Sequence, residues 1–192
     1  EKSGNAVFVV APYGSGKSIT AGYVGELVEN RAEAASMLDV VGQRMNAVDS
    51  AVATLACERR ESGTQGLFVP MYGHVPSASA ALKDGLLGAM RRCKLGRQAR
   101  ALERLSAENA HDVFELIADC SEKLETRGFD RLIIVWDEFG RHLQGLVSAG
   151  RSEELDVLQV LAEVVSRTSS LPVSLVLLLH RSLLGYAGGL PS

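Results

Sequence analysis

The sequence predicts an α/β fold of three layers, in which helices cover both faces of a mainly parallel β-sheet. Segments with helical periodicity separate short apolar segments, which is typical of parallel strands joined by crossover helices. The strand candidates are apolar throughout and do not alternate with polar residues, as expected of strands buried on both faces. These candidates are Ala6–Val10 and residues 66–71, 131–136 and 172–179.

Helical periodicity is clearest in the segments between these strands. We expect helices over residues 17–30, 76–93, 109–127 and 150–167, and one long amphipathic helix over residues 37–60. Pro70 limits the pairing of the second strand, because proline cannot donate to a sheet ladder. The apolar stripe of the long helix consists of Leu38, Val41, Met45, Val48, Val52 and Leu55.

The composition is that of an ordinary globular protein. The chain has 192 residues, of which 46% are hydrophobic and 22% are charged, so we expect one domain with a packed core. Three cysteines in no zinc-site spacing indicate reduced thiols in a cytoplasmic protein. The longest apolar runs have the length of strands and are too short to span a membrane. Because the chain begins at Glu1 and ends soon after a strong strand, we expect residues 1–192 to be a fragment of a longer chain.

A glycine-rich loop follows the first strand and carries the clearest motif. Ala11 to Ser18 match the phosphate-binding loop, with Ala11 at the position where glycine is commonest. Gly14 and Gly16 allow a tight turn whose backbone N–H groups face an anion, and the helix that follows adds its N-terminus. Lys17 is expected on the outer phosphates of ATP, and the hydroxyl of Ser18 on Mg²⁺. The residues expected to bind the nucleotide are Pro12, Tyr13, Gly14, Ser15, Gly16, Lys17, Ser18 and Ile19.

Two carboxylates, Asp137 and Glu138, follow the third strand directly. At the end of a strand beside a phosphate loop, Asp137 is expected to hold Mg²⁺, and Glu138 to orient the water that attacks the terminal phosphate. The alternative is an ordinary helix start, with Asp137 as N-cap and Glu138 in the first turn.

Polar residues also end the fourth strand. His180 is expected to contact the terminal phosphate or the attacking water if this strand lies between the first and the third, and a surface histidine is the alternative. Arg181 and Arg141 are candidates for arginine fingers that stabilise transferred charge, and solvated surface arginines are the alternative.

Five basic residues lie close together near the middle of the chain. They could contact nucleic acid, although the net charge of −3 gives no general basic surface and no aromatic residues are interleaved. A solvated helix face is the other interpretation. The five residues are Arg91, Arg92, Lys94, Arg97 and Arg100.

The two motifs resemble the additional-strand, catalytic-glutamate division of P-loop NTPases, and within it the AAA+ and signalling (STAND) ATPases. The resemblance implies a three-layer αβα P-loop NTPase fold in which the fourth strand separates the first from the third. It further implies ATP with Mg²⁺ and frequent assembly into rings or higher oligomers. The stretches Tyr13–Ser18 and Trp136–Gly140 are also similar to large bacterial ATPases of phage-defence systems. A fifth strand and the usual helical lid are not visible after Tyr186.

These observations favour an ATPase that drives or switches a larger assembly, in DNA-linked or phage-defence processes, through protein partners or self-association. Glu138 supports hydrolysis, because it is suited to activate water. One alternative is a nucleotide-gated interaction module with little turnover, which docks through the 37–60 helix. Another is a small-molecule kinase, for which the residues between Arg91 and Arg100 are the one candidate for an arginine-rich lid.

Overall fold

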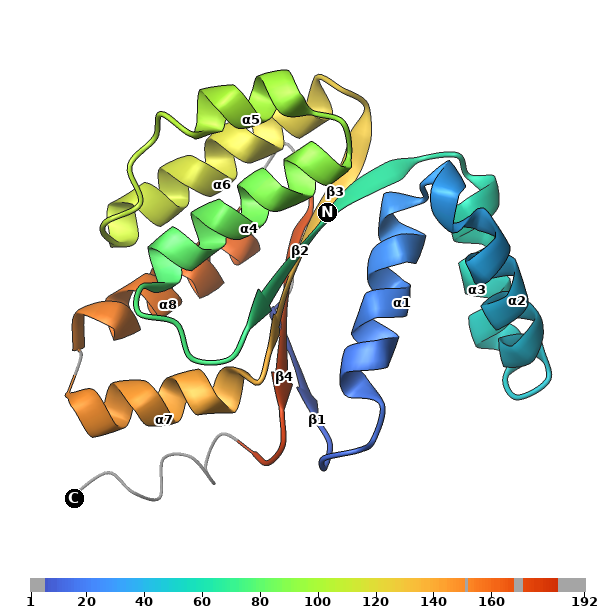
Figure 1. Cartoon of the computed structure of the whole chain (residues 1–192), viewed down its shortest axis with the longest axis horizontal. Coiled ribbons are helices and arrows are strands. Elements are labelled where there is room, and N and C mark those ends of the chain that lie inside the picture. Colours follow the sequence, from blue (N-terminus) through green and yellow to red (C-terminus); the bar gives the residue numbers. More distant parts are fainter. Residues whose placement is uncertain (1–5, 151, 168–170, 183–192) are drawn as a thin grey trace.

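The computed structural model describes residues 6–150, 152–167 and 171–182, and contains one parallel sheet between two layers of helices (Figure 1). The strands are β1 (Ala6–Val10), β2 (Gln65–Tyr72), β3 (Phe129–Asp137) and β4 (Val173–Leu179). All three strand pairs are parallel, in the order β1-β4-β3-β2. This is the α/β fold with a parallel sheet expected from the sequence, and β4 separates β1 from β3. The segment after Tyr186, where neither a fifth strand nor a helical lid was expected, lies outside the described residues.

Helices cover the two faces of the sheet unequally. One face carries α4 (Ala78–Arg92), α6 (Ala110–Glu125), α7 (Phe139–Ala149) and α8 (Ser152–Arg167), with α5 (Gly96–Leu102) packed outside α4 and α6. On the other face lie α1 (Lys17–Glu29), α2 (Ala35–Asn46) and α3 (Ser50–Glu61), and a short 3-10 turn, η1 (Ala32–Ala34), leads from α1 to α2. The helices α5 and α7 were not expected from the sequence.

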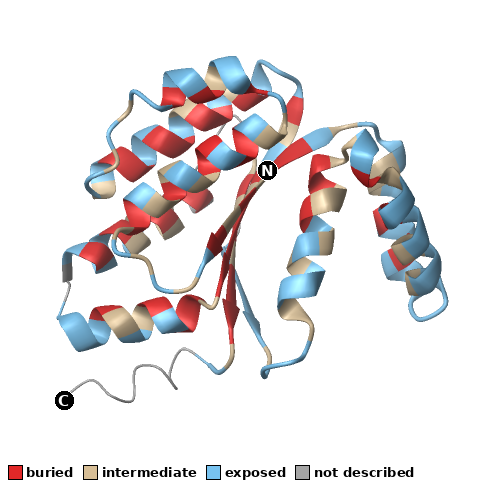
Figure 2. Cartoon of the chain, viewed as in Figure 1, coloured by how far each residue is buried: buried red, intermediate tan, exposed pale blue. Residues whose placement is uncertain are grey.

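The hydrophobic core lies between the sheet and the α4–α6–α8 layer. Strand residues on that face, such as Leu67, Ile134 and Leu175, are buried against Leu86 and Leu116 of the helices. Figure 2 shows this concentration of buried residues on the side of α4, α6 and α8, whereas α2 and α3 are mostly exposed. The stability of the chain therefore depends mainly on one of the two layers.

The expectation that β1 is buried was wrong. All five of its residues are exposed, including Phe8 at 48%. Within the described part of the chain, β1 is an edge strand that pairs only with β4, so it lacks the second neighbour and the helical cover that bury a central strand. Pro70 lies on β2, the opposite edge strand, where a residue without an N–H is tolerated.

The single helix expected over residues 37–60 is two helices, α2 and α3, joined by a turn. The helix is interrupted at Asp49. Its side chain accepts hydrogen bonds from the backbone N–H groups of Ala51 and Val52 and so caps α3. The expected apolar stripe is divided in consequence: Leu38 is buried, whereas Val48 in the turn is exposed. Together α1, α2 and α3 line a largely apolar hollow of about 1000 Å³.

Arg59 attaches α3 to the beginning of β3. Its guanidinium donates to both Asp130 oxygens, at 2.5 and 3.2 Å, and to the backbone oxygen of Val28 at 2.7 Å. Burial tends to raise the pKa of Asp130, but the hydrogen bonds from Arg59 and Arg131 outweigh it and lower this pKa. The contribution of Asp130 to stability is therefore present above its unfolded pKa and is lost as the pH falls through its lowered value.

Replacing Arg59 with methionine is expected to lower the free energy of unfolding by about 2 kcal/mol, because Asp130 and the Val28 oxygen lose their partner. Urea denaturation at neutral pH measures this change. Arg91→Met is the matched control: its ion pair with Glu103 is exposed, so its loss should cost less than about 1 kcal/mol. Equal effects of the two substitutions would contradict the anchoring role of Arg59.

Candidate nucleotide-binding site

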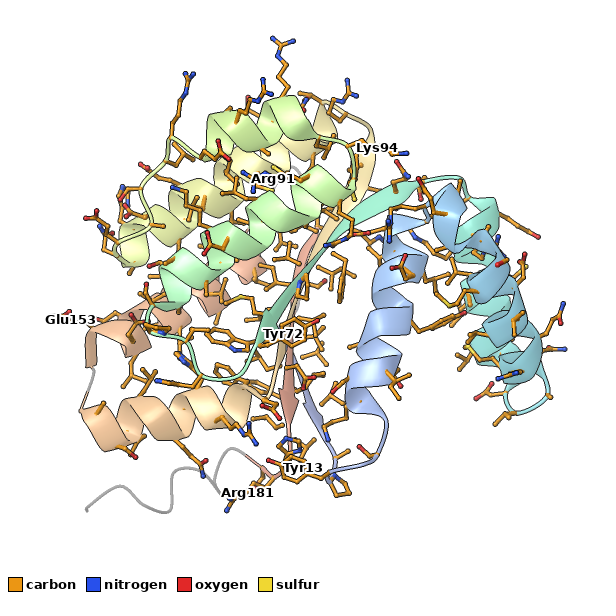
Figure 3. All side chains as sticks on the ribbon, viewed as in Figure 1. Tyr13, Tyr72, Arg91, Lys94, Glu153 and Arg181 are labelled. Atoms are coloured by element: carbon orange, nitrogen blue, oxygen red, sulfur yellow. The ribbon has the colours of Figure 1, made fainter. Side chains whose placement is uncertain are left out.

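The carboxyl ends of β1, β3 and β4 bring the sequence motifs to one end of the sheet. The phosphate loop follows β1. Asp137 is the last residue of β3 and Glu138 comes next, whereas His180 directly follows β4, which lies between β1 and β3. Figure 3 shows Tyr13 and Arg181 close together at this end, with Tyr72 of β2 farther along the sheet. Parallel pairing thus unites residues that are far apart in the sequence.

The phosphate loop has the backbone conformation that its glycines were expected to supply. Gly14 and Gly16 have φ angles of 76° and 84°, in the left-handed region where other residues are strained. Gly16 is the N-cap of α1 and has no capping side chain, so the first N–H groups of the helix lack a side-chain partner there. Such N–H groups are suited to receive an anion.

The ammonium of Lys17 is folded back onto its own loop. It donates to the backbone oxygens of Ala11 at 2.5 Å and Pro12 at 2.8 Å, and lies 3.3 Å from the hydroxyl of Ser15. It also lies 3.4 Å from Nδ1 of His180. The positive charge is thus held at the mouth of the loop by backbone oxygens, which phosphate oxygens could replace.

Ser18 and Asp137 meet across the site. The hydroxyl of Ser18 donates a hydrogen bond to Oδ2 of Asp137, whose side chain is buried. The other oxygen, Oδ1, accepts from the backbone N–H of Glu138 at 2.8 Å. A hydroxyl beside one carboxylate is a ligand set that Mg²⁺ accepts, since this ion binds one or two carboxylates and keeps several waters. The residues present therefore fit the expected metal.

Glu138 lies at a sharp change of backbone direction. Its φ of 54° is in the left-handed region, and α7 begins at the next residue. A helix does start here, as the alternative interpretation held, but no side chain caps it, and Asp137 instead contacts Ser18. Oε2 of Glu138 forms an ion pair of 2.9 Å with Arg141, a candidate finger one turn further on. Non-glycine residues in this conformation cluster at functional sites.

Charged residues of the site act on the pKa of His180. Burial and the nearby Lys17 ammonium lower its pKa, while Glu138 and Asp137 act in the opposite direction. A neutral imidazole at neutral pH follows from the lowered pKa. Arg181 comes next in the chain and is exposed, and Ile19 at the start of α1 is also exposed, at 82%.

Two contacts at this end were not foreseen from the sequence. Gly73, which follows β2, donates its N–H to the backbone oxygen of Asp137 at 2.8 Å and accepts from the indole of Trp136 at 3.0 Å. A side chain at Gly73 would approach Oε2 of Glu138, since a Cβ there would lie 3.8 Å away. The sequence signal that could have indicated these contacts is a glycine directly after a predicted strand. The second contact is the stacking of Tyr13 on His180.

The basic residues from Arg91 to Arg100 lie elsewhere. Figure 3 labels Arg91 and Lys94 at the end of the molecule opposite to Tyr13. Arg92 donates to the buried carboxylate of Glu29 at 2.5 Å and to the backbone oxygen of Phe68 at 2.6 Å, so it holds α4 against α1 and β2. Lys94 pairs with Glu33 at 2.9 Å. Part of the basic run is therefore structural.

The three thiols are free, and none has a lowered pKa; burial raises the pKa of Cys93 and of Cys120 to about 12. No helix among the described residues is long and apolar enough to cross a membrane.

The comparisons with known proteins support the fold. No family model and no curated protein matches the sequence. Among solved structures, the Aeropyrum pernix ORC2 protein, determined in ADPNP and ADP complexes, is similar with a TM-score of 0.53 and 14% identity. The match covers 98% of this chain and 38% of that protein, so this chain spans well under half of its length. A Drosophila ORC structure, bound to AT-rich DNA and Cdc6, matches over all of this chain and 23% of its own at 12% identity, with a TM-score of only 0.38. The chain has the αβα fold of P-loop NTPases.

Proposed function

We propose that this chain is the nucleotide-binding part of an ATPase, which binds ATP with Mg²⁺ and hydrolyses it. The observation that carries the proposal is the contact between Ser18 and Asp137 at the mouth of a loop with two left-handed glycines. This contact joins the phosphate loop and the acidic strand end in one site, which an isolated glycine-rich turn would not require.

Each residue has a role in the proposed reaction. Backbone N–H groups between Tyr13 and Ile19, with the ammonium of Lys17, bind and orient the phosphates. Ser18 and Asp137 hold Mg²⁺, which supplies charge neutralisation of the phosphate oxygens. Glu138 accepts a proton from the water that attacks the terminal phosphate, and His180 donates to a phosphate oxygen or to that water. Arg181 stabilises transferred charge.

AAA+ and STAND ATPases are the class that we propose, on the order of the strands and the polar residue that ends β4. The Aeropyrum pernix ORC2 protein, which resembles this chain in fold, was solved with ADPNP and ADP. We further propose that the domain is part of a longer protein, and that turnover drives or switches an assembly with protein partners.

A nucleotide-gated module with little turnover is the second candidate. The ion pair between Glu138 and Arg141 favours it, because the guanidinium contacts Oε2, one of the two oxygens that could accept a proton from water. The small-molecule kinase loses support, since its one candidate for a lid, the run from Arg91 to Arg100, lies at the far end of the molecule (Figure 3).

Phosphate release tests the proposal directly. Purified protein with ATP and Mg²⁺ is expected to release phosphate without any organic acceptor, and removal of Mg²⁺ with a chelator should abolish the release. Asp137→Asn should raise the Mg²⁺ concentration that release requires, whereas Asp84→Asn, on the remote helix α4, should not. Binding of ATP without release would favour the gated module, and an absolute need for an acceptor would favour a kinase. Failure to bind ATP would contradict all three.

A further inference from the structure

Arg141 and Glu138 form an ion pair at the start of α7. Nη1 of Arg141 lies 2.9 Å from Oε2 of Glu138. The backbone N–H of Arg141 also donates to the backbone oxygen of Glu138 at 2.9 Å, so the two residues are neighbours in the first turn of the helix. The side chain of Arg141 is 59% exposed and that of Glu138 is 33% exposed. An ion pair that water reaches in this way contributes little to stability and is easily exchanged.

Arg141 also lies close enough to His180 to act on its pKa. Burial and the Lys17 ammonium lower the pKa of His180, and Arg141 acts in the same direction. Nδ1 of His180 is 3.4 Å from the ammonium of Lys17. One imidazole therefore lies within the influence of both cations. The guanidinium of Arg141 thus belongs to the end of the sheet where the phosphate loop and the acidic pair meet.

A terminal phosphate would compete with Glu138 for this guanidinium. The terminal phosphate of ATP carries more negative charge than a carboxylate and offers several acceptor oxygens to the planar fork of an arginine. An exposed arginine has many rotamers, so the exchange requires no movement of α7. The exchange would also take the guanidinium away from Oε2, so that both oxygens of Glu138 could accept a proton from water.

We propose that Arg141 is a phosphate-binding residue that rests on Glu138 in the nucleotide-free protein and transfers to the terminal phosphate when ATP binds. Glu138 is then released to act on water only when its substrate is in place. This inference rests on the proposed ATPase function and adds to it a selection of triphosphate over diphosphate. ADP has no terminal phosphate that could take the arginine from Glu138.

Calorimetric titration with ADPNP and with ADP, each with Mg²⁺, tests the selection. ADPNP replaces ATP because its terminal phosphoryl group resists hydrolysis during the titration. Arg141→Met is expected to weaken the binding of ADPNP by about 10-fold and to change the binding of ADP by less than about 2-fold. Arg91→Met is the matched control: it removes another exposed arginine with an ion pair, at the opposite end of the molecule, and should change neither affinity.

A second experiment separates phosphate binding from relief of repulsion. Removing Arg141 leaves Glu138 without its counter-ion, and the free carboxylate could by itself repel the terminal phosphate. This repulsion is absent in a Glu138→Gln background. If Arg141 binds the phosphate, Arg141→Met should weaken the binding of ADPNP by about 10-fold in that background as well. A loss of affinity that occurs only when Glu138 is present would mean that Arg141 merely neutralises Glu138, and would overturn the proposal.

The other outcomes distinguish this proposal from the proposed function. Equal losses of affinity for ADPNP and ADP would overturn the role of Arg141, because the arginine would then not act on the terminal phosphate. If the unchanged protein binds both nucleotides and Arg141→Met has no effect, the nucleotide site stands and the role of Arg141 is refuted. If the unchanged protein binds neither nucleotide, the proposed function itself is refuted.

Discussion

Replacing Lys17 with alanine is expected to abolish measurable binding of ATP. The ammonium is the one side-chain cation that the phosphate loop itself carries, and it is held within hydrogen-bonding reach of the loop's own carbonyl oxygens. Charge-assisted hydrogen bonds contribute roughly 1.5–3 kcal/mol each, so the loss of contacts to two phosphate oxygens should weaken binding by about 100-fold or more. Calorimetric titration with Mg²⁺ and ATP measures this effect.

Lys94→Ala is the matched control for this substitution, because Lys94 is exposed and lies at the opposite end of the molecule. It should bind ATP as the unchanged protein does. A thermal unfolding curve of Lys17→Ala checks that the variant is folded, since it also loses the bonds to Ala11 and Pro12. Unchanged affinity in a folded Lys17→Ala protein would show that the loop does not bind the phosphates.

Replacing Glu138 with glutamine is expected to preserve binding of ATP and to stop its turnover. The amide has nearly the same shape as the carboxylate but cannot accept a proton from water, and a general base typically contributes about 100-fold to 10,000-fold to the rate. The expected result is therefore an affinity within about 3-fold of the original and a kcat lower by at least about 100-fold. Titration and phosphate release measure the two quantities separately.

Glu115→Gln tests whether the loss of any exposed carboxylate has this effect. Glu115 lies on α6, where it pairs with His111, away from the phosphate loop. Its kcat should not change. Phosphate release by Glu138→Gln at the original rate would exclude Glu138 as the base and would direct attention to His180.

The strands and the first helix could be predicted from the sequence, because apolar segments mark the strands and the glycine-rich loop marks the start of the helix. The apolar segment Ala6–Val10 is β1 with the same bounds, and α1 begins at Lys17, directly after a glycine that ends the loop. The position of β4 between β1 and β3 followed from the resemblance to P-loop NTPases. The juxtaposition of Ser18 and Asp137 could be anticipated in the same way, because parallel strands bring their carboxyl ends together.

Features that the spacing of apolar residues does not specify could not be predicted. The apolar period of residues 37–60 continues through the turn between α2 and α3, so only the capping side chain of Asp49 marked the break. The exposure of β1 depends on which strands neighbour it, which its own residues do not specify. The ion pair of Glu138 with Arg141 and the stack of Tyr13 on His180 require side-chain directions that spacing alone does not define.

β1 lies at the edge of the sheet and leads into the phosphate loop. Binding of a ligand to this loop should therefore change the free energy of local unfolding of β1. Among the strands that the structure describes, β1 has one hydrogen-bonded neighbour and β3 has two. The side chains of β1 are also in contact with water, so β1 should open at a lower free energy than β3. The phosphate loop is continuous with this weakly protected strand. Any anion that ties the loop to α1 and to the end of β3 would favour the closed form by mass action. Bound nucleotide would then stabilise the edge strand of the sheet in addition to serving as a substrate.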